Sequence, residues 1–416
     1  MEGIIIKEIV CRGNRLDIDF TVSKGLEQYF LPEHHFFAEY SCDISDVPPS
    51  VLVVPLLANL MPFAWLVDCV VWVNEIDRDF YESLYRIERG FQEMYPDFRF
   101  RGSLIPAYVV DNRYEPKQEA LSLFTGGIDA TTTFLRHMCE KPILFNSNGW
   151  YTEDIREDAV YTADRTAIEA VAGEFGVGSC FARSNFATFI RAKVMTEYIQ
   201  KQKIKNSWWR GFQHSMAFLG CAAVAGYHHR IARMYIGSSH TFGEHAQIVS
   251  DPRIDGAFCA ASMSTIHDSY DLSRQDKVRY LVRQQKLLNK VLPLRVCSFN
   301  DHNCCACEKC LRTMLAIAAE GGDLKDFGFE LPDTFLNTLK AFLKNAVLEV
   351  DPIHAPFWHA IIKRMEENYD ILLEREVYHH LKDFDFEGAR RAWLREYYTK
   401  NFFKIVKRKL GLGKSK

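Results

Sequence analysis

Apolar residues recur along this chain with two different periods, and the change from one period to the other outlines its architecture. Alternating apolar positions over residues 4–23, on either side of Arg12-Gly13-Asn14, predict a β-hairpin. Apolar positions at helical spacing over residues 77–95 predict an amphipathic helix. From about residue 117, short apolar runs alternate with helical patterns; the runs are residues 118–124, 143–148, 179–185 and 232–237. Such alternation predicts an α/β fold, a parallel sheet with helices on both faces.

The pattern changes again beyond about residue 330, where it becomes helical and charged and ends in a basic tail. Three regions are therefore expected. They are an N-terminal α+β module over residues 1–115, a central α/β domain over 116–325, and a C-terminal helical region with its tail over 326–416. The basic tail itself is expected to be a solvated terminus.

Composition narrows the class of protein. The 416 residues are 48% hydrophobic and 25% charged, with a formal net charge of −3. This near-neutral balance argues against a nucleic-acid-binding protein. The first residues lack the basic region and cleavage pattern of a signal peptide, and no apolar run reaches the ~18 residues of a membrane span. A cytoplasmic protein without membrane contact is expected.

The junction between the first predicted strand of the central region and its helix reads FTGGIDATT, residues 124–132. Glycines at such a turn let the backbone approach a ligand, and the N–H groups of the following helix attract anions. Thr125 adds a hydroxyl, and Asp129 beside a polyphosphate would require a bridging cation such as Mg²⁺. A tight turn with Thr125 as a helix N-cap is the structural alternative, and the residues alone leave both open.

Five of the twelve cysteines form a compact group at residues 297–310. Cys297, Cys304, Cys307 and Cys310 can surround one tetrahedral Zn²⁺, and the spacing leaves Cys305 over. A cysteine-ligated iron–sulfur cluster is the rival metal. The other seven cysteines lie mostly in apolar surroundings and are expected to be small buried hydrophobic residues.

These two motifs carry a resemblance to a known family. FTGGIDATT resembles the SGGxDS loop of the ATP-pyrophosphatase (PP-loop) superfamily, with Thr125 and Ala130 in place of its two serines. Cys-x6-Cys-x2-Cys-x2-Cys about 170 residues later is similar to 7-cyano-7-deazaguanine synthase, in whose CGxCxxC pattern Cys305 takes the glycine position. The resemblance spans about residues 118–318. It implies a PP-loop (HUP-like) fold, a zinc knuckle at 297–310, and cleavage of ATP to AMP and pyrophosphate.

The resemblance, together with the positions of residues at strand ends and beside tryptophans, also predicts site residues. The expected ATP-binding set comprises Thr125, Gly126, Gly127, Ile128, Asp129, Ala130, Thr131, Asn185 and Ser238. The expected catalytic residues are Asp129, Lys277 and Arg210. Arg274 and Lys277 can neutralise a polyphosphate, and an exposed helix face is their alternative. Trp208 and Trp209 can stack on a purine or belong to the core. His214, His240 and His245 are candidates for acid–base steps or structural groups.

The expected function is an ATP-dependent ligase or synthase that adenylates a carboxylate or carbonyl group of a deazapurine-like molecule, another metabolite or a peptide. The alternative is a catalytically decayed nucleotide-binding subunit. Synthase-like PP-loop proteins occur in phage-defence operons, so operon partners or a homodimer are possible assemblies. RNA thiolation would need a cysteine pair outside the zinc shell, for which Cys180 and Cys259 are candidates.

Overall fold

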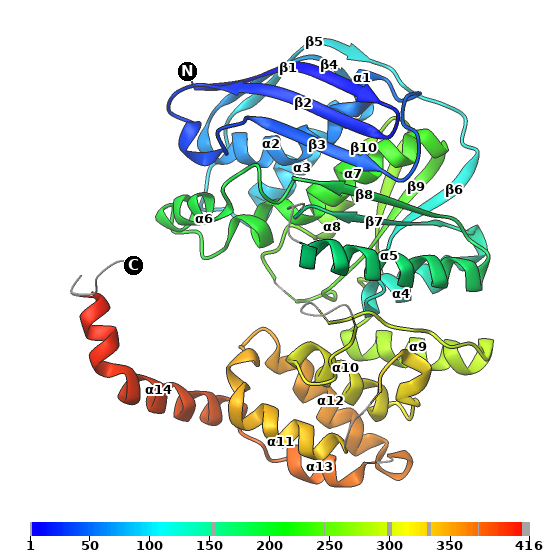
Figure 1. The fold of residues 1–416 in the computed structure, drawn as a ribbon, viewed down its shortest axis with the longest axis vertical. Coiled ribbons are helices and arrows are strands. Elements are labelled where there is room, and N and C mark those ends of the chain that lie inside the picture. Colours follow the sequence, from blue (N-terminus) through cyan, green and yellow to red (C-terminus); the bar gives the residue numbers. More distant parts are fainter. Residues whose placement is uncertain are drawn as a thin grey trace. The chain divides into compact units, whose positions relative to one another are not determined.

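The computed structural model describes residues 2–150, 155–244, 246–297, 302–330, 334–372 and 374–409, excluding the side chains of 155–158 and 403–409. The chain divides into two compact units, Met1–Lys277 and Val278–Lys416, coloured from blue to green and from yellow to red in Figure 1. Among the helices described, none combines the length and the apolar character that crossing a membrane requires.

The first unit is built on a large, mostly parallel sheet. Its strands are β1 (Gly3–Arg12), β2 (Arg15–Val22), β3 (His35–Tyr40), β4 (Val70–Asp77), β5 (Ser103–Val110), β6 (Gln118–Leu123), β7 (Ile143–Asn148), β8 (Ser179–Ser184), β9 (Ile231–Gly237), β10 (Cys259–Ala260) and β11 (Met263–Asp268). Their order across the sheet is β10-β11-β9-β6-β7-β8-β3-β2-β1-β4-β5. The expected α/β class with a parallel sheet is confirmed.

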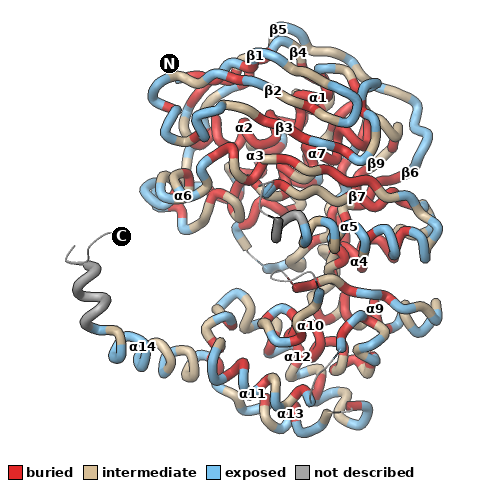
Figure 2. Tube along the Cα trace, viewed as in Figure 1, coloured by how far each residue is buried: buried red, intermediate tan, exposed pale blue. Residues whose placement is uncertain are grey.

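The helices of this unit pack against the sheet and against one another. They are α1 (Pro49–Leu52), α2 (Val54–Val67), α3 (Arg78–Met94), α4 (Ile128–Arg136), α5 (Ile155–Phe175), α6 (Ala192–Lys201), α7 (His214–His229) and α8 (Pro252–Asp255), and α9 (Arg274–Leu288) begins at the end of the unit. Helix α7 lies between α2 and the strands β6, β7 and β9, and Figure 2 shows both helices buried. Helices enclosed in this way are apolar on every side, so their sequences lack a helical period.

The N-terminal predictions hold in detail. β1 and β2 pair as an antiparallel hairpin whose turn contains Gly13 at a φ of +63°. Helix α3 begins where Asp77 caps it, with the Asp77 carboxylate accepting a hydrogen bond from the Phe80 amide at 2.9 Å. Helix α3 also contacts β4, β5 and β10, which lie at the two ends of the sheet order, so the sheet curves around it.

The central strands form a parallel block in the order β8-β7-β6-β9-β11. The chain moves outward from β6 through β7 to β8 and then returns to β9 on the other side of β6. The expected strands are all present. β11 was not expected, because its sequence MSTIHD is short and mixes polar with apolar residues.

The compact units do not follow the expected region boundaries. β3 pairs with β8, so the strands of residues 1–115 belong to the same sheet as the central block, without a break at residue 115. The division of the chain instead falls between Lys277 and Val278, inside the expected region 116–325. Backbone pairing between strands far apart in sequence, which composition does not reveal, joins the two parts.

The second unit is helical in its described residues. It contains the rest of α9, followed by α10 (Glu308–Ala319), α11 (Phe335–Asn345), α12 (Ala355–Glu367), α13 (Arg375–Leu381) and α14 (Phe386–Lys409). A buried polar group joins α10 to α12. The Glu308 carboxylate accepts hydrogen bonds from Arg312 at 2.8 Å and from the Trp358 indole at 2.9 Å.

Candidate functional site

The predicted loop lies at the carboxyl ends of the parallel strands, at the point where the order of the strands along the chain reverses. Residues 125–127 follow β6, and residues 238–240 follow its neighbour β9. Connections from these two strands lead to opposite sides of the sheet order, which makes the space between their ends a topological switch point. Open parallel sheets bind ligands at such points. The loop expected to bind ATP therefore lies where this architecture places a ligand.

The backbone of the loop leaves the N-terminus of α4 without a side-chain cap. Gly126 has a φ of +73°, in the left-handed region that favours glycine, and Gly127 is the N-cap residue with a φ of −76°. The Thr125 hydroxyl accepts only a long contact, 3.4 Å, from the Gly127 amide. Thr125 is therefore not the N-cap residue. Its exposed side chain and the first N–H groups of α4 can face a ligand.

Asp129, in the first turn of α4, is held between two cations that come from α9. The Lys277 ammonium lies 3.1 Å from Asp129 Oδ1, and the Arg274 guanidinium lies 3.0 Å from Asp129 Oδ2. The Lys277 ammonium also donates a hydrogen bond to the Ser238 carbonyl. The structure thus brings together Asp129, Lys277 and Ser238, which the sequence analysis placed in one site.

Lys277 is an unusual group for a protein interior, because its side chain is only 1% exposed. Desolvation by burial lowers its pKa from the ordinary 10.5, and the nearby Asp129 carboxylate acts in the opposite direction. Lys277 and Arg274 both contact Asp129 beside the positive end of α4, and the Asp268 carboxylate also acts on Lys277. The two cationic side chains and the helix N–H groups can contribute to binding an anion here.

Gly237 allows β9 and α4 to approach closely at this point. A Cβ atom on Gly237 would lie 2.7 Å from the Asp129 carbonyl oxygen and 2.8 Å from its carbon, which are closer than real Cβ atoms come. A second ion cluster lies nearby at the end of β11. There Asp268 contacts Arg136 at 3.3 Å and His137 at 3.2 Å. The sequence analysis did not single out Asp268, because β11 was not expected and only its pairing with β9 brings Asp268 to this end of the sheet.

Ala130 and Thr131 continue α4 and are buried, at 8% and 5% exposure. The Thr131 hydroxyl has no hydrogen-bond partner in the described part of the chain. Ile128 is buried as well. These three residues hold the helix start in the core, while the exposed Thr125 and the partly exposed Gly127 form its accessible edge.

Asn185 has a structural role here. Its side-chain oxygen accepts a hydrogen bond from the Phe37 amide at 3.0 Å, and its nitrogen donates to the His35 carbonyl at 2.9 Å. The side chain thus extends the junction between β3 and β8. Any contact with a nucleotide would compete with these two bonds.

Arg210 lies in a π-helical turn, Trp209–Gln213, directly before α7. Such turns are rare and often occur at functional sites. The charge of Arg210 contributes, after desolvation and other charges, to lowering the pKa of His240, which follows β9. Arg210 is therefore near the loop after β9, whereas Lys277, Arg274 and Ser239 contact Asp129 directly.

The aromatic and histidine candidates from the sequence differ in how far they are buried. Trp208 is fully buried, whereas Trp209 is partly buried and packs beside Trp150, with ring centroids 4.6 Å apart. Burial lowers the pKa of His214, whose Nδ1 contacts the Trp209 carbonyl at 3.2 Å. His245 lies outside the described residues.

The second unit contains the expected cysteine cluster. The sulfur atoms of Cys297, Cys304, Cys307 and Cys310 all lie within 4.8 Å of one another, so these residues can hold a metal ion such as zinc. Cys307 is the N-cap residue of α10, and its amide donates to Cys304 Sγ at 3.4 Å. A hydrogen bond with Cys310 lowers the pKa of Cys307, which favours its thiolate.

Cys305 is outside this group, as the spacing predicted. Its sulfur donates to the Asn303 carbonyl at 3.5 Å, and its backbone φ is +54°. A positive φ is uncommon for a residue with a Cβ atom and is the usual place for glycine. The position occupied by Cys305 thus has the conformation of a glycine position.

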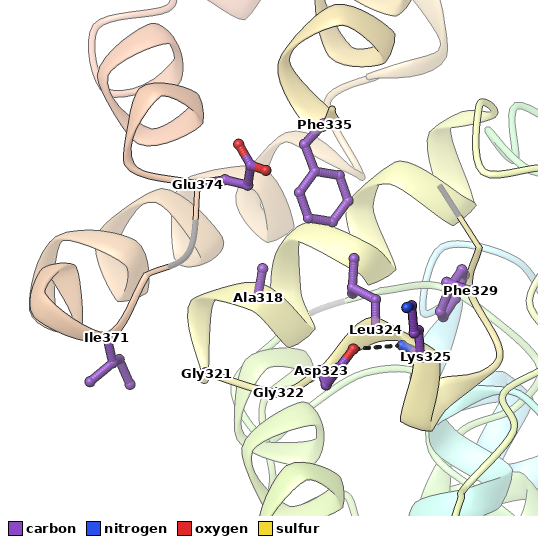
Figure 3. A pocket seen from close by; sticks show the side chains of 10 residues that line it. All are labelled: Ala318, Gly321, Gly322, Asp323, Leu324, Lys325, Phe329, Phe335, Ile371 and Glu374. Carbon is purple, nitrogen blue, oxygen red and sulfur yellow. Dashed lines mark hydrogen bonds between the residues drawn. The ribbon is translucent and has the colours of Figure 1, made fainter. Parts of the chain in front are cut away.

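A cavity of about 380 Å³ lies elsewhere in the second unit. Figure 3 shows the residues that line it: Ala318, Gly321, Gly322, Asp323, Leu324, Lys325, Phe329, Phe335, Ile371 and Glu374. Its lining is mostly apolar and includes no residue of the expected ATP site. We favour the switch point as the functional site because it combines N–H donors with a buried lysine and a partly buried arginine.

Comparisons with models of known protein families, with curated proteins and with solved structures found no significant match.

Proposed function

We propose that this protein is an ATP-dependent ligase or synthase that binds the phosphates of ATP at the α4 N-terminus and releases AMP and pyrophosphate. The observation that supports this most strongly is the buried Lys277, held with Arg274 on Asp129 at the switch point of the sheet. Burying a lysine costs free energy, so its presence is easier to explain where it binds an anionic ligand.

Each group at the site has a role in this proposal. The N–H groups after Gly126 and Gly127 bind phosphate oxygens, and the Thr125 hydroxyl donates a hydrogen bond to a phosphate oxygen. Lys277 and Arg274 neutralise the negative charge that develops as pyrophosphate leaves. Asp129 positions these two cations. Both of its oxygens already face cations, so we assign Mg²⁺ to the phosphates of ATP and not to Asp129.

The resemblance to PP-loop proteins supports the choice of ATP and of cleavage between its α and β phosphates. Two structural features agree with it. The glycine loop follows the strand from which the parallel block is wound, and Cys305 has a backbone conformation typical of glycine, the residue at that position in the synthase pattern. The acceptor in this proposal is a carboxylate or carbonyl group, which is adenylated and then attacked by a nitrogen or sulfur nucleophile.

We also propose that the ion held by the four cysteines is Zn²⁺. Zn–S bonds of about 2.3 Å at a tetrahedral angle place two sulfurs about 3.8 Å apart. Cys304 Sγ and Cys310 Sγ are 3.9 Å apart. An iron–sulfur cluster distributes its cysteine ligands over two or more iron atoms, so it would spread the four sulfurs further apart than one ion does.

A catalytically inactive nucleotide-binding subunit is the second candidate. The observation that favours it is Ala130, which is buried in the first turn of α4 and has no hydroxyl where the resembling loop has a serine. RNA thiolation is not favoured. Cys180 lies near the amino end of β8, whereas the loop after β6 lies at the carboxyl ends of the parallel strands.

The test is nucleotide chromatography after incubation of the protein with ATP, Mg²⁺ and a panel of carboxylate-containing metabolites and peptides. The proposal predicts AMP and pyrophosphate in equal amounts, dependent on an acceptor. The Lys277→Met variant should lose this activity. Lys286→Met, an exposed lysine on the same helix, should keep it.

Release of ADP would contradict the proposed cleavage. Tight binding of ATP that Lys277→Met abolishes, together with no product from any acceptor, would favour the inactive subunit. Absence of ATP binding to the wild-type protein would reject both candidates.

A further inference from the structure

Three potential metal ligands meet in the first unit, near the amino ends of the parallel strands, whereas the proposed ATP site lies at their carboxyl ends. They are Cys42, in the loop after β3, Cys180 near the start of β8, and His229 in the last turn of α7. The two sulfurs and a ring nitrogen of His229 all lie within 4.8 Å of one another. The sequence analysis expected both cysteines to be small buried hydrophobic residues because of their apolar surroundings, and it also named Cys180 as a candidate for RNA thiolation.

The distances fit one soft metal ion. Cys42 Sγ and Cys180 Sγ are 3.7 Å apart, close to the approximately 3.8 Å expected for two sulfurs on a tetrahedral zinc. His229 Nε2 is buried and has no hydrogen-bond partner among the described residues, and the His229 side chain lies close enough to the Cys42 thiol to interact with it. A buried imidazole nitrogen without a partner is costly, and metal ligation would satisfy it.

The surrounding structure holds the three ligands in place. Ser41, next to Cys42, is fixed to β8 by two hydrogen bonds with Phe181, one through each backbone amide, at 2.9 Å. His228, next to His229, contacts the Asp46 carboxylate at 2.9 Å. The negative end of α7 also favours a cation near its last turn. These contacts preorganise the cluster from three elements of the fold.

We propose that Cys42, Cys180 and His229 form a second zinc site, independent of the four-cysteine cluster and of the proposed ATP chemistry. Two thiolates and one imidazole are ligands that suit zinc, and three protein ligands leave the fourth position to water. Cys42 is only partly buried, so solvent can reach the cluster. The site would join β3, and the β1–β2 hairpin that pairs with it, to the parallel block.

A disulfide between the two cysteines is the competing explanation. Their sulfurs are well beyond the bonded distance of about 2.05 Å, and bond formation would remove two electrons and two protons, which requires an external oxidant such as a peroxide or another disulfide. A disulfide would also leave His229 without a partner. The metal site accounts for all three side chains.

Elemental analysis of the full-length protein, loaded with Zn²⁺ under reducing and oxygen-free conditions and then desalted, tests the proposal. Wild type should contain two zinc ions per chain. Cys42→Ser, Cys180→Ser and His229→Gln should each contain one. One neighbouring substitution serves as a control and should leave two ions: Cys11→Ser, near the same loop.

Titration of the metal-free protein with Co²⁺ gives a second readout, because thiolate-to-cobalt absorption should fall in the two cysteine variants. If Cys180→Ser does not fold, the partly exposed Cys42 and His229 still provide the test. A single zinc per wild-type chain would overturn the proposal. So would a second zinc that survives all three substitutions, or a Cys42–Cys180 disulfide in protein isolated under these reducing conditions.

Discussion

The four-cysteine cluster and the Asp129 site are assembled in opposite ways. The cluster takes all its ligands from residues 297–310, so its spacing can be read directly from the sequence. The Asp129 site joins the start of α4 to a lysine 148 residues later, and its position depends on the order of the strands. A locally encoded site of this kind stabilises its surroundings, whereas one assembled by the whole sheet can place charges around a substrate.

The Cys42, Cys180 and His229 cluster shares one property with each of these two sites. It has the ligand chemistry of the four-cysteine cluster, but it is assembled by the fold, as the Asp129 site is. For this reason the sequence revealed one cysteine cluster and hid the other. Spacing identifies a metal site only when its ligands are neighbours along the chain.

The largest expected effect is on the locally encoded site. Cys304→Ser removes one of the four proposed zinc ligands and should lower the free energy of unfolding of the second unit by several kcal/mol, since binding to structural zinc sites contributes on the order of 10 kcal/mol. Thermal unfolding with and without a chelator, together with zinc analysis, measures this. Unchanged stability in the variant would show that the cluster is not a structural metal site.

A smaller and different effect is expected at the Asp129 site. Gly127→Val places a side chain in the proposed phosphate space, and the φ of −76° at Gly127 is accessible to valine without backbone strain. ATP affinity should fall by about a hundredfold, or roughly 2.7 kcal/mol, with little change in the melting temperature. Gly173→Val is the matched control, because a Cβ atom there meets no atom within 4 Å.

Equilibrium binding of labelled ATP to both glycine variants gives the comparison. If Gly127→Val binds ATP as wild type does, the loop does not contact the phosphates. If it unfolds instead, Gly127 belongs with the residues that stabilise the fold, and the contrast between the two sites weakens.

The smallest expected effect is at Cys305. Cys305→Gly removes a buried thiol but relieves a left-handed backbone conformation, and each contribution is about 1 kcal/mol. The stability should therefore change by less than about 1 kcal/mol, and the zinc content should stay the same. Denaturant unfolding and metal analysis check this. Loss of zinc would make Cys305 a ligand and would contradict the grouping of the other four cysteines.

Much of the fold could be predicted from local patterns, but contacts between distant segments could not. The hairpin, the amphipathic helix α3 and the alternating strands all carry their own periods. Residues 51–73 carry none, because α2 is buried on nearly every side. The joining of β3 to β8, which removed the expected boundary at residue 115, rests on backbone hydrogen bonds that have no compositional signal.

The candidate site shows the same limit. The glycine loop was visible because strand, glycines and helix follow one another. Lys277 entered through a weak resemblance, and only the structure shows that it reaches Asp129. Asn185 looked equally well placed after its strand, yet its amide serves the backbone of β3. Sequence position at a strand end does not reveal which neighbour uses a side chain.

The central claim is that Lys277 binds the phosphates of ATP, and the pH dependence of ATP affinity in wild type and Lys277→Met tests it most directly. Only the protonated lysine attracts an anion, and burial lowers its pKa from 10.5. The affinity of the wild-type protein for ATP should therefore weaken as pH rises. This loss of affinity should begin at a lower pH than it would if an ordinary lysine bound the phosphates. Lys277→Met should bind at least tenfold more weakly at neutral pH and lack this step. Equal affinity and the same pH profile in both proteins would contradict the account.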